Sequence, residues 1–159
     1  MRHLYRWWPF AGGIAGLALG IVFLVRLDRP QLYFWLFLAL LMLHHFEEAA
    51  FPGGIRRWLN ETVFRSSDPT EPFTDGRAFV NDVVVGWGGF ALAAVVGTRL
   101  TWLAFVPIFV LAFDAWFHIS YTIGSGRYAP GTVFASPTRP TADAVDREWI
   151  ARYLARPRP

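Results

Sequence analysis

The chain has 159 residues and no cysteine, which excludes a disulfide framework and thiolate chemistry. Hydrophobic residues make up 54% of it and aromatic residues 18%, while only 17% are charged, so its composition is unlike that of an ordinary soluble domain. The net charge is only +3, and the basic residues fall in loops and tails, which argues against a nucleic-acid-binding surface. The composition therefore predicts an all-α polytopic membrane protein whose outer surface contacts membrane lipid.

Four apolar segments are long enough to cross a bilayer, since about 20 residues at about 1.5 Å per residue match the hydrocarbon thickness. We expect a bundle of four transmembrane helices, at about residues 9–25, 32–51, 78–96 and 101–123. In the first segment Gly12, Gly16 and Gly20 recur at every fourth position, a pattern that favours close helix packing. This glycine-rich face is also the expected surface for any oligomerisation.

The distribution of arginine predicts the orientation in the membrane. Twelve arginines lie on the side of the two termini and of the long loop before the third span, against three on the other side, Arg26, Arg29 and Arg99. By the positive-inside rule both termini are then cytoplasmic, as expected for a multi-pass protein of the plasma membrane. We expect residues 1–135 to form the membrane domain and residues 136–159 a cytoplasmic tail with a short amphipathic helix.

Residues 44–48 read His-His-Phe-Glu-Glu near the end of the second apolar segment. Burying an ionisable group at bilayer depth costs about 2.5–3.5 kcal/mol on insertion scales, so such groups are rarely filler. His44, Glu47 and Glu48 are three and four residues apart and therefore project from one helical face. His45 points further round the helix and is expected to be a bystander.

Two other spans carry polar groups at a matching depth. Asp82 lies near the start of the third span, and Asp114 and His118 lie one turn apart near the end of the fourth. At about 1.5 Å per residue, all of these groups fall roughly 4–14 Å from the cytoplasmic ends of their helices, which predicts a site open to the cytoplasm. Gly86 and Gly89 are expected to let the third span approach closely. The predicted site comprises His44, Glu47, Glu48 and His118, with Asp114 supporting His118 and Asp82 at the margin.

Three interpretations of this polar layer remain open. Buried carboxylates and histidines can exchange protons in an enzyme, with the glutamates as bases and His44 and His118 as proton shuttles. The same histidines with Glu47, Glu48, Asp82 and Asp114 can instead hold one or two divalent ions. The third interpretation is a hydrogen-bonded network that only locks the helices.

The preferred function is a membrane-embedded enzyme acting on a lipophilic small molecule that enters laterally or from the cytoplasm. The main alternative is a proton-coupled carrier, in which the same groups load and unload protons. Four spans without an inverted repeat make the carrier the weaker of the two.

The motif at residues 44–48 resembles the H-x-x-E-E signature of the HXXEE-domain family of small membrane proteins. His118 and the sequence Arg-Tyr-Ala-Pro-Gly-Thr-Val-Phe-Ala at residues 127–135 resemble the later histidine and the Y-x-P-G-x-x-x-A segment of that family. The resemblance covers about residues 32–135 and implies a polytopic membrane enzyme of unspecified reaction. At Asp114 the family usually carries an asparagine. The resemblance implicates His44, Glu47, Glu48 and His118 as functional residues. If a divalent metal ion binds, we expect the same four residues to be its ligands.

Overall fold

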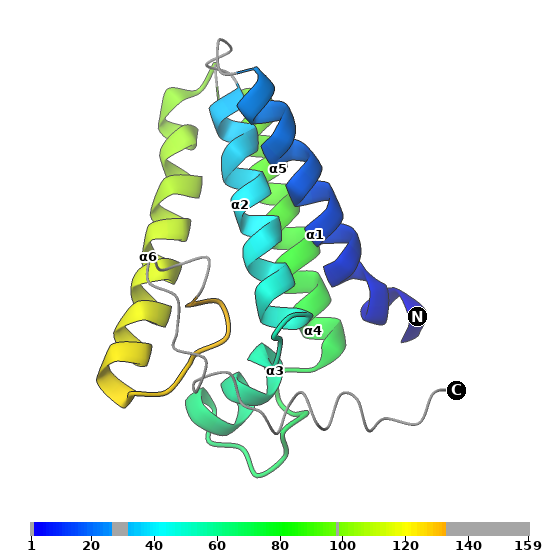
Figure 1. Ribbon diagram of the computed structural model, residues 1–159, viewed down its shortest axis with the longest axis vertical. Helices are drawn as coiled ribbons and strands as arrows, with labels where there is room; N and C mark the ends of the chain where they lie inside the picture. The colour runs from blue at the N-terminus through cyan, green and yellow to red at the C-terminus, as the bar shows by residue number, and fades with distance from the viewer. Residues whose placement is uncertain (1, 27–31, 98, 133–159) are drawn as a thin grey trace.

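The computed structural model describes residues 2–26, 32–97 and 99–132, and all regular structure in these ranges is helical (Figure 1). The all-α prediction is therefore confirmed for this part of the chain. The amphipathic helix expected in the tail of residues 136–159 lies outside the described residues.

The described residues form a series of helical segments. In chain order they are α1 (Arg2–Val25), α2 (Leu32–Ala49), α3 (Ile55–Trp58), the π-helical turn η1 (Leu59–Val63), α4 (Asp75–Phe79), the π-helical segment η2 (Val80–Trp87), α5 (Gly88–Val96) and α6 (Thr101–Ser125). The segments α4, η2 and α5 run on as a single helix from Asp75 to Val96.

Among the described residues, three helices, rather than the predicted four, are long and apolar enough to cross a membrane: Leu4–Val25, Asp75–Val96 and Phe105–Ser125. Helix α2 falls short because the two histidines and two glutamates of residues 44–48 lie in its last turns and lower its mean hydropathy. The polar residues 44–48, which predict a functional site, are thus also the reason why α2 falls short in hydropathy where the other three helices do not.

Helix α2 lies at the centre of the bundle, with α1 on one side, α5 behind it and α6 on the other side (Figure 1). Its contact with α1 depends on glycine, because a Cβ atom on Gly16 would lie 2.9 Å from the carbonyl oxygen of Ala39. A Cβ on Gly20 would meet no atom within 4 Å. The predicted glycine face therefore packs against α2 at Gly16 but is open at Gly20.

Below α2, the connection to α4 is organised by Asn60, whose side chain is fully buried. Its amide nitrogen donates to the carbonyl oxygens of Pro69 (3.0 Å) and Phe73 (3.2 Å), and its amide oxygen accepts from the Phe73 N–H (2.7 Å). These bonds fold the polar loop back onto α3 and η1, which occupy residues 55–63. The arrangement places Trp58 beside the end of α6.

Candidate functional site

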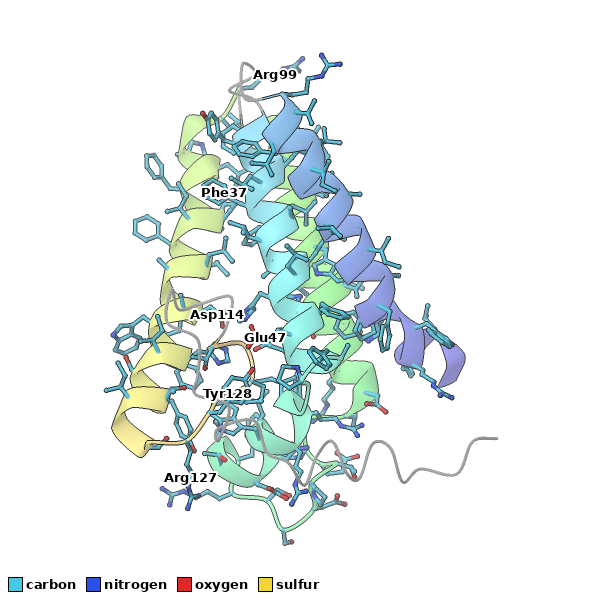
Figure 2. All side chains as sticks on the ribbon, viewed as in Figure 1. Phe37, Glu47, Arg99, Asp114, Arg127 and Tyr128 are labelled. Carbon is cyan, nitrogen blue, oxygen red and sulfur yellow. The ribbon has the colours of Figure 1, made fainter. Side chains whose placement is uncertain are left out.

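Two helices deliver two matched pairs of side chains to one place. On α2, His44 and Glu48 are one turn apart, and on α6, Asp114 and His118 are one turn apart. Across the helix interface, His44 Nε2 lies 2.7 Å from Asp114 Oδ2, and His118 Nε2 lies 3.1 Å from Glu48 Oε1. Figure 2 shows Asp114 on α6 at the level of the last turns of α2. We call these four residues the His–carboxylate cluster.

Within each helix the same atoms are also close. His44 Nε2 is 3.4 Å from Glu48 Oε1, and His118 Nε2 is 3.5 Å from Asp114 Oδ1. The two imidazole rings are 5.2 Å apart at 72°. Both Nε2 atoms are therefore directed at the same pair of carboxylates, which gives a compact set of two nitrogen and two carboxylate donors.

Three members of the cluster are buried, namely His44, Glu48 and His118, while Asp114 is partly exposed. Among the residues that the structure describes, His44 Nε2 makes no hydrogen bond of acceptable geometry despite its short distance to Asp114, and His118 Nδ1 has no hydrogen-bond partner. Buried polar atoms are nearly always satisfied, so unsatisfied ones call for an explanation such as a bound ion or water. The unsatisfied nitrogen at the centre of the cluster is consistent with a ligand atom for a metal.

A segment following α6 covers this cluster. Residues Tyr128 to Thr132, which we call the strap, turn back over the end of α2, and Ala129 and Thr132 within it are buried. Gly131 has a φ of 100°, and a Cβ there would lie 2.6 Å from His44 Cε1 and 3.0 Å from Glu48 Oε1. Only glycine combines this positive φ with so close an approach. The strap backbone therefore forms one wall of the site.

Glu47 faces the strap and not the cluster. The Tyr128 hydroxyl donates a hydrogen bond to Glu47 Oε1, and the Glu47 side chain is buried (Figure 2). Burial and the hydrogen bond to Glu47 together raise the pKa of the Tyr128 phenol well above its ordinary value, so Tyr128 stays protonated as the donor. Of the two adjacent glutamates, the structure brings Glu48 into the cluster and leaves Glu47 to tie down the strap.

His45 and Asp82 form a second polar group on another face of α2. The Trp87 Nε1–H donates to His45 Nδ1 at 3.0 Å, and His45 Nε2 lies 3.9 Å from Asp82 Oδ1. A Cβ on Gly86 would approach His45 Cε1 to 3.3 Å, so this glycine does permit close packing, whereas Gly89 faces open space. Asp82 therefore pairs with His45, the expected bystander, and not with the cluster.

Sequence reasoning assigned no role at the site to Trp58, Tyr128 or Gly131. The Trp58 ring lies 6.1 Å from that of His118 and 4.8 Å from that of Tyr121, forming an aromatic wall behind the cluster. Nothing in the sequence around Trp58 distinguishes it from an interfacial anchor. Tyr128 and Gly131 belong to the Y-x-P-G segment. The family resemblance therefore pointed to them, whereas the spacing of residues in the sequence did not.

The donor set suits a divalent ion. One ligand atom each from His44, Glu48 and His118 lies within 4.8 Å of the others, and all three residues are buried. Imidazole nitrogen with carboxylate oxygen is the combination favoured by Zn²⁺ and similar borderline ions. Asp114, whose oxygens contact both imidazoles, is placed to supply a further oxygen.

Comparison with known protein families gives one match. Residues 35–139, which make up 105 of the 159 residues, match the family described as "Protein of unknown function with HXXEE motif". No curated protein and no solved structure matched the chain. The match contains both helical halves of the cluster and the whole strap, and it confirms the resemblance seen in the sequence. The chain belongs to the HXXEE family.

Proposed function

We propose that the protein is a metal-dependent enzyme embedded in a membrane, acting on a lipophilic small molecule. The observation that carries the proposal is the convergence of ligand atoms from His44, Glu48 and His118 within 4.8 Å in a buried site. Two histidines and one carboxylate form a ligand set typical of catalytic zinc, which leaves a coordination position for water or substrate. Such an ion would supply Lewis-acid polarisation of an oxygen-containing group or activation of water.

Asp114 is the group best placed to move a proton at this centre. Its two oxygens lie 2.7 and 3.5 Å from the two imidazole nitrogens, and it is the most exposed member of the cluster. A carboxylate beside the ion can accept a proton from a water or from a polar group of the substrate. In this assignment His44, Glu48 and His118 hold the ion and Asp114 acts as the general base.

The competing explanation is that the cluster only locks α2 to α6 through histidine–carboxylate contacts. A network that served stability alone would be expected to satisfy its buried donors and acceptors. Within the described residues, His44 Nε2 lies 2.7 Å from Asp114 Oδ2 and 3.4 Å from Glu48 Oε1, but neither contact has the geometry of a hydrogen bond. These close contacts without hydrogen-bond geometry support a ligand site over a purely structural network.

The metal content of the purified protein tests this proposal. After loading with Zn²⁺ and desalting, the protein should retain about one ion per chain, as a site with three protein ligands requires. Elemental analysis measures the ratio of metal to protein. A protein that retains no ion after loading with Zn²⁺, Mn²⁺ or Fe²⁺ would overturn the metal assignment and leave metal-free acid–base chemistry or the structural network.

The topology of the proposed enzyme includes α2 as a fourth membrane span, in a plasma-membrane protein with cytoplasmic termini. Support comes from the burial of His44, His45, Glu47 and Glu48, which hides the groups that lower the hydropathy of α2 from lipid. Its 18 residues extend about 27 Å at about 1.5 Å per residue, close to the hydrocarbon thickness. The excess of arginine near the termini supports the orientation.

Cysteine labelling tests the orientation in a chain that has no cysteine of its own. We expect Arg99→Cys to react with a membrane-impermeant maleimide added outside intact cells, and Ser66→Cys to react only after permeabilisation. The two positions lie at opposite ends of the spans, so each serves as the control for the other. Labelling of position 66 but not 99 in intact cells would reverse the proposed topology.

A further inference from the structure

The His–carboxylate cluster is sealed on one side and exposed on another. We propose that it opens laterally to the bilayer between α2 and α6, and that its substrate is a membrane-dissolved amphiphile rather than a water-soluble metabolite. This inference rests on the proposed enzymatic function of the cluster. It replaces the cytoplasmic opening that the depth of the polar residues predicts.

The side facing the polar loop is sealed by the strap. Tyr128 is bonded to Glu47 at one end of the strap, and Thr132 Oγ1 lies 3.0 Å from Thr122 Oγ1 at the other. Between them, Ala129 is fully buried and donates its N–H to Thr122 Oγ1 at 3.3 Å. The Gly131 backbone lies directly against His44 and leaves no room for even a methyl group. A polar molecule arriving from this side meets packed backbone.

On one face of α6, the exposed fraction of the residues increases from His118 toward the start of the helix, away from the strap. Three residues spaced by four, and therefore stacked on that face, change from buried to exposed. The His118 side chain is 3% exposed, that of Asp114 is 36%, and Val110 is 45% exposed. On this face of α6 the cluster is thus uncovered progressively toward the middle of the helix, at membrane depth, whereas the strap covers the cluster at the other end.

Helix α2 shows the same trend on the face that meets Asp114. His44 is 5% exposed, and Leu40, one turn earlier on the same face, is 40% exposed. His44 and Asp114 are in direct contact at 2.7 Å. Leu40 and Val110 therefore stand one turn above that contact, on the two helices that make it. The residues one turn above the contact are therefore apolar, and those that make the contact are polar.

These side chains define the class of substrate. Leu40 and Val110, one turn from His44 and Asp114, are apolar and exposed and offer no charge to a soluble ion. An apolar chain gains free energy by lying against such side chains, at about 25 cal/mol per Å² of area removed from water. A polar group on the same molecule would then reach Asp114 and His44. The fitting ligand is an amphiphile that diffuses within the membrane.

Two carbodiimides distinguish the two routes to the site. Dicyclohexylcarbodiimide partitions into the bilayer and a cationic ethyl(dimethylaminopropyl)carbodiimide stays in water. Both activate carboxyl groups as O-acylisoureas, which either rearrange to stable N-acylureas or are trapped as stable amides by added glycinamide, and both products are counted as adducts. The full chain in lipid nanodiscs, freed of metal by chelation, is treated with each reagent and adducts are quantified by peptide mass spectrometry. We expect the lipophilic reagent to modify Asp114 about tenfold more than the aqueous one, since each CH₂ group favours transfer from water by about 0.8 kcal/mol. Glu61 and Asp75, which are exposed outside the bundle, should show the reverse preference.

Opening the strap should create the missing aqueous route. Tyr128→Phe removes the hydrogen bond to Glu47, and we expect it to raise modification of Glu48 by the aqueous reagent several-fold. Tyr33→Phe, the same change at the far end of α2, should leave the labelling unchanged.

Two results with the native protein would overturn the lateral opening. One is that the aqueous reagent modifies Asp114 and Glu48 as readily as Glu61, and the other is that neither reagent modifies Asp114. Failure of the protein to retain any ion after loading with Zn²⁺, Mn²⁺ or Fe²⁺ would instead overturn the proposed function and leave the labelling pattern standing.

Discussion

Replacing Glu48 with Gln is expected to lower the affinity for Zn²⁺ by about 100-fold or more, a loss at least as large as that seen when residues supporting a metal ligand are removed. The substitution keeps the size of the side chain but removes the only anionic oxygen among the three converging donors, His44, Glu48 and His118. Neutral amide oxygen binds borderline ions much less strongly than carboxylate. The affinity is measured by competition with a chelator in detergent solution.

Glu47→Gln is the matched comparison, because it is the same chemical change one residue away at a side chain that is also buried. Its carboxylate accepts the Tyr128 hydrogen bond and is not among the converging donors, so we expect Zn²⁺ affinity within a few-fold of the native value. If the cluster is only structural, Glu48→Gln should instead lower the free energy of unfolding by about 1–3 kcal/mol without changing metal content. Equal loss of metal in both variants would contradict the assignment of Glu48 over Glu47.

Helical periodicity is what made the cluster predictable. Residues four apart share a face, so the pairs His44–Glu48 and Asp114–His118 can each be recognised in the sequence as one ligating surface. Matching depths in two long apolar segments then indicate that the surfaces meet, and the structure brings them within 2.7 Å. The energetic argument holds because ionisable groups at that depth must find partners.

Helical periodicity could not predict that Glu48 joins the cluster while Glu47 contacts the strap. Residues at i+3 and i+4 from His44 lie on nearly the same face, so periodicity alone favours neither as its partner. The choice is made by Tyr128, which is 81 residues further along the chain and takes the Glu47 carboxylate. The strap itself has no periodic pattern, and its path depends on contacts that form only after α2 and α6 have come together. Hydropathy likewise could not show that the polar groups of α2 point inward.

Asp82 illustrates the limit of the depth argument. It lies at the predicted level, but its helix meets α2 on the face of His45, where Trp87 and Gly86 complete the packing. Depth predicts which residues share a layer, whereas the rotation of each helix decides which of them touch. That rotation depends on the fit of side chains at the helix interface, and a single sequence does not specify it.

Replacing Gly131 with Ala is expected to disrupt the cluster from the strap side. The new methyl group would lie 2.6 Å from His44 Cε1 and 3.0 Å from His118 Cε1, so either the strap or the imidazoles must move. The left-handed backbone at φ 100° adds strain for any residue with a Cβ, typically about 1–2 kcal/mol. We expect a lower melting temperature in detergent together with a loss of Zn²⁺ affinity of about tenfold or more, as for the loss of groups that orient metal ligands. Gly126→Ala is the matched control, because Gly126 also has a positive φ, 65°, but its Cβ would meet none of the described residues within 4 Å. That variant should carry the backbone strain alone and keep native metal affinity, whereas equal effects of the two substitutions would mean that the contact between the strap and the cluster contributes nothing.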